Sequence, residues 1–138
     1  MKNYQHELEL SLYPQEYTLA MSIENNNIVK YGAVSYNSKR MQLFMYNYLN
    51  RIPDKIVIVD YGIDGYPTIS ILQYTGNFII YTERYYTDNI ANFQTFLGYN
   101  IIERYRKNKR NLIRDYNLIT CDNKEIPVFR DYLVRLKN

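Results

Sequence analysis

The chain has 138 residues, of which 46% are hydrophobic and 22% charged, so its composition is that of one globular domain and excludes a disordered or collagen-like chain. The formal net charge of +3 is too small to indicate nucleic-acid binding by itself. A single Cys and a single His exclude an internal disulfide and a histidine-based metal site, and we expect no cofactor. No apolar run is long enough to span a membrane and no secretory signal opens the sequence, so we expect one domain, residues 1–138, in the cytoplasm.

The first third of the chain is predicted to contain both strands and helices. Residues 6–12 alternate polar and apolar side chains as a half-buried strand does, and residues 28–34 are also typical of a strand. Residues 15–24 fit either type, but the Pro before them and the Asn run after them favour a short helix. Ser38 is a suitable N-cap for a helix over residues 39–51. The apolar side chains of this helix recur at helical spacing: Met41, Phe44, Met45, Tyr48 and Leu49.

The centre of the chain predicts an antiparallel meander. Its three strands, 55–61, 68–74 and 78–83, are rich in apolar residues and are joined by short turns that contain Gly. After the meander, Asp88 is a suitable N-cap for a short helix over residues 89–97.

The last third of the chain predicts a long hairpin. Residues 99–105 and 111–119 are typical of two strands that flank a polar, basic turn, and residues 126–136 fit either a strand or a helix. Together the elements predict an α+β fold, an antiparallel sheet of about five strands with one main helix packed on one face. Phe44 and Ile58 should lie in the core between that helix and the sheet.

Three segments around the predicted meander resemble a known family. They are NNIVKYG (residues 26–32), DKIVIVDYGIDGYPTI (54–69) and LQYTGNFIIYT (72–82). Over about residues 16–121 the chain resembles a domain-of-unknown-function family of small Gram-positive lipoproteins, whose core reads N-G-D-V-V … D-K-I-x-I-V-x-Y-T-x-E-G-D-P-I … L-x-Y-D-G-x-x-I-x-Y. These motifs are patterns of strands and turns, so the resemblance assigns no biochemical role.

The sequence departs from that family at the lipid anchor and the cysteines. Cys121 stands where the second of two family cysteines lies, whereas Gly98 and Tyr99 stand at the first, and the lipobox Cys is absent. Of the family's acidic, Asn-rich stretch after the third strand, only Asp88 is retained. These departures fit a cytosolic or phage-encoded relative. The alternative is an extracytoplasmic lipoprotein whose signal and anchor have been removed.

The sharpest local feature is a basic cluster with Tyr105 interleaved: Arg104, Arg106, Lys107, Lys109, Arg110 and Arg114. Charge is uneven along the chain, since residues 1–69 carry 6 basic and 7 acidic side chains (net −1) and residues 70–138 carry 11 and 7 (net +4). The cluster fits a solvated hairpin end that protects a sheet edge. It also fits a contact with an acidic protein surface, or a ribbon that binds nucleic-acid phosphates.

Four carboxylates lie on or near the predicted meander: Asp60, Asp64, Glu83 and Asp88. Asp60 and Asp64 flank a turn and can converge on a hard cation such as Ca²⁺, but their spacing is far from that of a calcium-binding loop, and an Asp-Gly pair is typical of a turn. The sequence contains no phosphate-binding loop and no zinc-ligand spacing, and no nucleophile can be matched to His6. We therefore expect neither an enzyme nor a metal site.

Binding is the function that these features favour. The 17 Tyr residues fit sheet packing combined with AT-rich codon usage, or a dedicated recognition surface. We predict a small non-enzymatic binding or inhibitory protein that masks or senses a macromolecule, namely a protein with an acidic surface, through an exposed Tyr/Arg-rich sheet face and the basic hairpin. The alternative is a protein that binds nucleic acid, or blocks a nucleic-acid machine, with the hairpin 104–114. The expected contact residues are Tyr81, Arg84, Tyr85, Tyr86, Arg104, Tyr105, Arg106, Lys107, Lys109 and Arg110.

Overall fold

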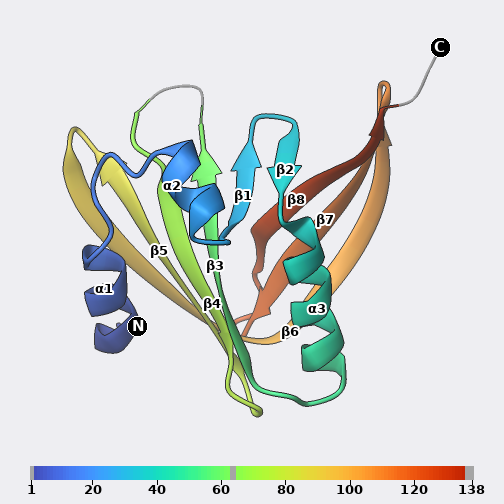
Figure 1. The fold of residues 1–138 in the computed structure, drawn as a ribbon. Helices are drawn as coiled ribbons and strands as arrows, with labels where there is room; N and C mark the ends of the chain where they lie inside the picture. Colours follow the sequence, from blue (N-terminus) through green and yellow to red (C-terminus); the bar gives the residue numbers. More distant parts are fainter. Residues whose placement is uncertain (1, 63–64, 136–138) are drawn as a thin grey trace.

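The computed structural model describes residues 2–62 and 65–135, and Figure 1 shows them as a strongly curved sheet with helices packed against it. The helices of this part of the chain are α1 (Tyr4–Ser11), α2 (Leu19–Glu24) and α3 (Ser38–Leu49). The strands are β1 (Ile28–Tyr31), β2 (Val34–Tyr36), β3 (Asp54–Tyr61), β4 (Thr68–Tyr74), β5 (Ile79–Thr87), β6 (Ile90–Asn108), β7 (Asn111–Thr120) and β8 (Glu125–Arg135). They form one sheet in the order β2-β1-β3-β4-β5-β6-β7-β8, in which β1 and β3 pair in parallel and the other neighbours are antiparallel.

The expected sheet of about five strands with one main helix is wrong, because the described residues form eight strands and three short helices. Residues 28–34 supply β1 and the start of β2 rather than one strand, and residues 89–97, expected as a helix, belong almost entirely to β6. Of residues 126–136, which fitted either type, those up to Arg135 lie in β8, and residue 136 falls outside the described residues. The helix expected over 39–51 is present as α3, although Ser38 is its first residue and not its N-cap.

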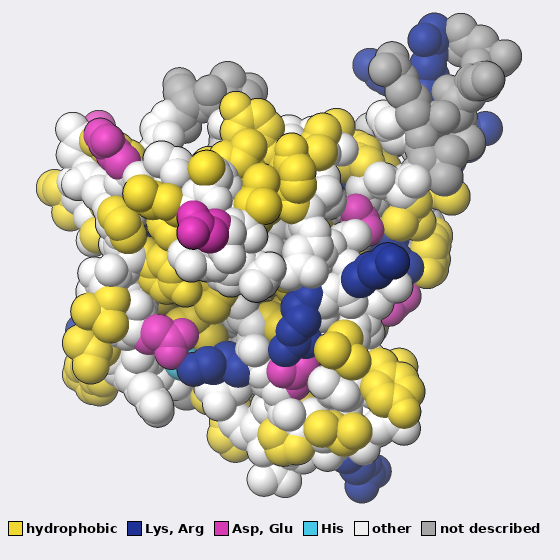
Figure 2. All heavy atoms as spheres, viewed as in Figure 1, with side chains coloured by type: hydrophobic (Ala, Val, Ile, Leu, Met, Phe, Trp, Pro, Cys, Tyr) yellow, Lys and Arg dark blue, Asp and Glu magenta, His cyan; other side chains and the backbone are white. Residues whose placement is uncertain are grey.

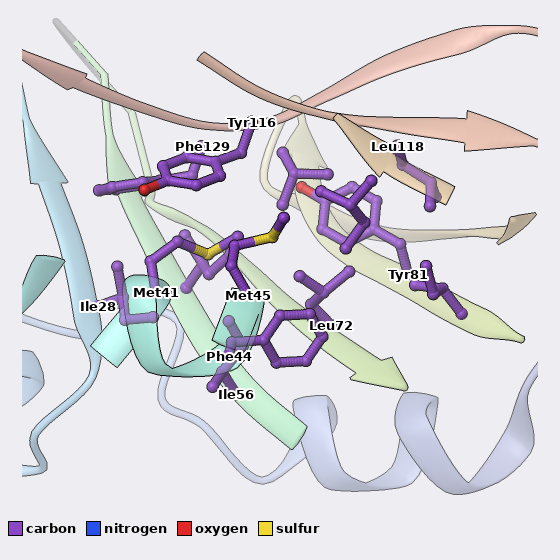
Figure 3. Packing of buried hydrophobic residues seen from close by; sticks show 14 of the residues in the cluster. Ile28, Met41, Phe44, Met45, Ile56, Leu72, Tyr81, Tyr116, Leu118 and Phe129 are labelled. Atoms are coloured by element: carbon purple, nitrogen blue, oxygen red, sulfur yellow. The ribbon is translucent and has the colours of Figure 1, made fainter. Parts of the chain in front are cut away.

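The central meander is confirmed, since β3 pairs with β4 and β4 with β5 in antiparallel fashion. Both predicted core residues, Phe44 and Ile58, are buried. The sheet wraps around α3, and the face that packs against this helix is called the inner face below (Figure 3). The inner cluster joins Met41, Phe44 and Met45 of α3 to one or more residues from seven of the strands, among them Ile28, Ile56, Leu72, Tyr81, Ile101, Leu118 and Phe129.

Helix α1 replaces the strand expected over residues 6–12 and covers the outer face of the sheet. In a segment where Leu and Glu alternate, each apolar residue is also four positions from the next apolar residue but one. A helix places residues that are four positions apart on the same face. His6 and Leu10 have that spacing and are buried, whereas Leu8 and Leu12 are exposed. The second apolar cluster, on the outer face, therefore takes only Leu10 from this helix.

Two buried polar side chains fasten α1 to β4 and β5. His6, expected outside the core, is only 2% exposed, and its Nδ1 and Nε2 lie 2.9 Å from Thr82 Oγ1 and 2.6 Å from Gln73 Oε1. Arg84 is also 2% exposed. Its guanidinium donates to carbonyl oxygens in the last turn of α1 and just beyond it: Leu10 (2.9 Å), Tyr13 (2.7 Å) and Pro14 (3.1 Å). A cation at this end of a helix also complements the helix dipole.

Strand β6 is 19 residues long and changes partner at Gly98. Asp88 and Asn89 form the turn before it with φ of 51° and 65°, a conformation that Asp and Asn tolerate, so Asp88 begins a hairpin and does not cap a helix. Up to Gly98 the strand pairs with β5, and beyond it with β7 after a shift of register. A Cβ at Gly98 would overlap the side chain of Leu118 and lie 2.8 Å from the carbonyl oxygen of Ile119, so this close approach requires Gly.

The two edges of the sheet approach each other. β8, at one end of the strand order, contacts β2 and β1 at the other end, so the sheet is nearly closed around α3. None of the helices in the described residues is long and apolar enough to cross a membrane.

Candidate functional site

The β6–β7 hairpin ends in a two-residue turn that carries part of the basic cluster. Asn108 pairs with Asn111, so Lys109 and Arg110 form the turn, and Lys109 has a φ of 52°. Lys107, Lys109 and Arg110 are exposed, and we call these three residues the hairpin tip. In Figure 1 the tip projects at the upper right beside the end of β8, and Figure 2 shows Lys and Arg side chains around this projection.

Asp115 holds two arginines at the base of the hairpin. It is buried and accepts hydrogen bonds from Arg106 Nε at 2.8 Å and from Arg130 Nε at 2.7 Å. Burial alone would raise the pKa of this carboxyl group, but the two guanidinium groups together outweigh burial and hold the pKa of Asp115 below its usual value. Arg106 is therefore part of a structural ion cluster.

Two more arginines of the basic cluster are paired. Arg104 donates to both carboxylate oxygens of Glu125, at 3.1 and 3.0 Å, and Arg114 lies 3.6 Å from the buried Asp131. Tyr105 is 59% exposed, and its ring centre lies 5.9 Å from the guanidinium carbon of Arg114. The three arginines near the body thus have carboxylate partners, whereas no ion pair within the described residues includes a cation of the tip.

The acidic partners of these arginines were not expected from the sequence. Asp115, Glu125 and Asp131 come from β7 and β8, and only the register of three strands brings them next to the arginines. No local sequence signal indicated these pairs: Arg104 lies opposite Asp115 in the register of β6 and β7, yet it pairs with Glu125 of β8.

The expected contact residues do not form one surface. Tyr81 and Arg84 are buried, the first in the inner cluster and the second beneath α1. Tyr85 and Tyr86 lie near the β5–β6 turn, at the opposite end of β6 from Tyr105, which is about 40 Å further along that strand. We therefore restrict the candidate surface to the hairpin tip and Tyr105.

The four carboxylates expected near the meander are also separated. Asp60 and Glu83 lie on the inner face and line one cleft, Asp88 lies in the β5–β6 turn, and Asp64 falls outside the described residues. Among the residues that the structure describes, no group of three or more His, Cys, Asp or Glu side chains is placed to hold a metal ion. Cys121 is an exposed thiol in the β7–β8 turn.

Comparisons with known proteins complete the description of the site. No protein-family model, no curated protein sequence and no solved structure matches the chain. The resemblance to the lipoprotein family therefore stays a prediction.

Proposed function

We propose that this protein is a non-enzymatic binding protein that masks or senses an acidic surface of a partner protein with the end of its β6–β7 hairpin. The observation that carries the proposal is that some residues of the basic cluster have carboxylate partners and others do not. The arginines near the body have ion-pair partners in Glu125, Asp115 and Asp131, whereas the hairpin tip presents its charge to solvent. Charge placed in this way adds nothing to the core, but it steers association with an oppositely charged partner.

Neighbouring residues extend this surface. Tyr105 is exposed next to the tip, and Tyr and Arg are the side chains that most often anchor protein interfaces. β8 pairs with β7 as far as the turn, so the β7–β8 ladder supports the backbone at the base of the tip. The surface therefore combines an aromatic anchor with a local excess of positive charge.

A protein partner is favoured over nucleic acid by the small number of free cations. Each contacted phosphate requires a cation, and the tip offers three cations that have no ion-pair partner among the described residues, which together with a net charge of +3 allows only weak phosphate binding. The proposal assigns the protein to the cytoplasm, where the exposed thiol of Cys121 stays reduced.

The test compares two triple variants with the same change in charge. The tip variant carries Lys107→Glu, Lys109→Glu and Arg110→Glu, and the control variant carries Lys2→Glu, Lys39→Glu and Arg51→Glu at exposed positions outside the hairpin. In nuclease-treated lysate, wild type and the control should recover the same protein, and the tip variant should lose it. Association of the wild type should slow as salt is added, because the attraction is screened.

Two results would contradict the proposal. Equal recovery by the tip variant would leave the tip as a solvated hairpin end. A partner that disappears on nuclease treatment would assign the surface to nucleic acid, and binding of a DNA duplex should then weaken with salt with a log–log slope of about −0.9 per contacted phosphate.

A further inference from the structure

A cleft of about 260 Å³ opens between the two walls of the curved sheet, away from the hairpin tip. One wall comes from β1, β3, β4 and β5, and the other comes from β7 and β8. The volume is slightly below the range of pockets that hold drug-sized ligands, so the cleft suits a smaller organic molecule.

The register of the first wall places polar side chains side by side. Ser70 lies directly opposite Glu83, and Asp60 lies opposite Thr68 on one side and beside Lys30 on the other. All five residues line the cleft. Carboxylates and hydroxyl groups therefore occupy the inner face of the sheet just where the apolar packing around α3 ends.

The second wall is mainly apolar and carries one charged pair. Val128 and Phe129 line it, and Figure 3 shows Phe129 approaching from β8 toward the residues of the meander. Asp115 and Arg130 lie at this wall, where the Asp115 carboxylate accepts from Arg130 Nε at 2.7 Å and from Arg106 Nε at 2.8 Å, so this wall offers no carboxylate that lacks a cation. A ligand in the cleft thus meets an apolar surface on one side and the polar row on the other.

Glu83 is the lining carboxylate that has no cation. Asp60 Oδ1 lies 3.9 Å from Lys30 Nζ, whereas Glu83 has no ion pair among the described residues and accepts a long hydrogen bond from the Tyr81 hydroxyl, at 3.5 Å. Burial is the main cause that raises the pKa of Glu83. The hydrogen bond from the Tyr81 hydroxyl lowers this pKa, and the negative charge of Asp60 raises it further. A partly buried carboxylate without a counter-ion is unfavourable for the fold, and such groups are frequent at binding sites.

We propose that this cleft binds a small organic cation, with its ammonium group between Glu83 and Asp60 and its apolar part against Phe129 and Val128. An anionic ligand would be repelled by the carboxylates, and a neutral apolar ligand would leave Glu83 buried further without compensation. An ammonium group supplies the missing counter-ion, and Ser70 can accept a further hydrogen bond from it.

The test uses two monoamines, benzylamine and n-butylamine, which are cationic at neutral pH, and benzyl alcohol as a neutral analogue. Amide chemical shifts of the full chain should change saturably with both amines, with the changes concentrated in β3, β4, β5 and β8, and should change little with benzyl alcohol. Glu83→Gln keeps the shape of the side chain and should weaken amine binding by about tenfold or more, since it removes a charge-assisted hydrogen bond. Glu103→Gln, on the exposed part of β6, should leave the affinity unchanged.

Several outcomes would overturn the proposal. They are the absence of saturable shifts with either amine, equal affinity for benzylamine and benzyl alcohol, and unchanged amine affinity in a Glu83→Gln variant. Dispersed amide signals establish that this variant is folded. The hairpin-tip variant should bind the amines as wild type does, so this proposal and the proposed function can fail separately.

Discussion

The β3–β5 meander and the outer half of the β6–β7 hairpin are both antiparallel ribbons, but different interactions hold them. In the meander both faces are covered, so successive residues such as Ile71 and Leu72 are buried in the outer and the inner cluster. In the hairpin, the arginines near the body are held by ion pairs, such as the one that joins Arg106 to Asp115.

Within one continuous sheet, the meander therefore contributes most to stability, and the end of the hairpin is available for binding. Where a strand is covered on both faces, successive residues are apolar, as Ile71 and Leu72 of β4 are. A ribbon that extends beyond the body can be held by paired charges and can keep its turn free for a partner. We therefore expect large effects on folding in the meander and small ones at the tip, in the order that follows.

The largest effect is expected from Phe44→Ala in α3. Phe44 is fully buried in the inner cluster, so the truncation leaves a cavity and should lower the free energy of unfolding by about 3–5 kcal/mol. The matched change Leu43→Ala, at an exposed position of the same helix, should cost about 0.5 kcal/mol or less. Urea unfolding measures both, and an unchanged midpoint for Phe44→Ala would show that α3 does not pack on the sheet.

A somewhat smaller loss, about 3 kcal/mol, is expected from Arg84→Met beneath α1. The variant leaves the carbonyl oxygens at the end of α1 without their charged donor, and that of the fully buried Leu10 has no access to water. Hydrogen exchange should then become faster in α1 than in α3. Arg51→Met, at an exposed position, is the control. Equal protection of α1 in wild type and Arg84→Met would mean that Arg84 does not hold this helix.

Asp115→Asn tests the ion cluster at the base of the hairpin and should cost about 1–2 kcal/mol at pH 7. The pKa of Asp115 is lowered in the folded state, so its contribution is present above the unfolded pKa and is lost as pH falls through the folded one. The difference in unfolding free energy between wild type and the variant should therefore be constant above about pH 5 and shrink on acidification. Asp88→Asn, at an exposed turn, is the control variant, and a difference that grows in acid would contradict the ion cluster.

The smallest effect on folding is expected from the hairpin-tip variant. Exposed residues without ion-pair partners contribute little to stability, so the three reversals should change the unfolding free energy by less than about 0.5 kcal/mol. Thermal unfolding of this variant and of the charge-matched control measures the effect. A loss well above that value would make the tip a part of the fold and remove the distinction between the two ribbons.

The meander and α3 could be predicted from the sequence because the spacing of apolar residues in each of them fits only one type of secondary structure. Met41, Phe44 and Met45 recur at helical spacing, and the three strands are bounded by turns that contain Gly. α1 could not be predicted, because the spacing of its Leu and Glu residues fits a strand as well as a helix. The helix buries only His6 and Leu10. β6 was missed because Asp88 suits a turn as well as a helix cap.

The candidate site was visible from the sequence only in part. The density of Lys and Arg in residues 104–114 indicated an exposed hairpin end, since so many charges cannot be buried without partners. The pairing of Arg106 with Asp115, and the position of Glu83 and Asp60 in one cleft, depend on strand register. Local patterns contain no such information, so the charged pairs and the cleft required the structure.

The contact of β8 with β1 and β2 also has a consequence for synthesis of the chain. The ribosome releases α3 and β1–β5 first, yet the inner cluster is completed by Val128 and Phe129 of β8. Until those residues emerge, the nascent chain exposes part of the apolar surface around α3 and cannot close the sheet. A chain that stalls before β8 is therefore the form of this protein most prone to aggregation and most dependent on chaperones.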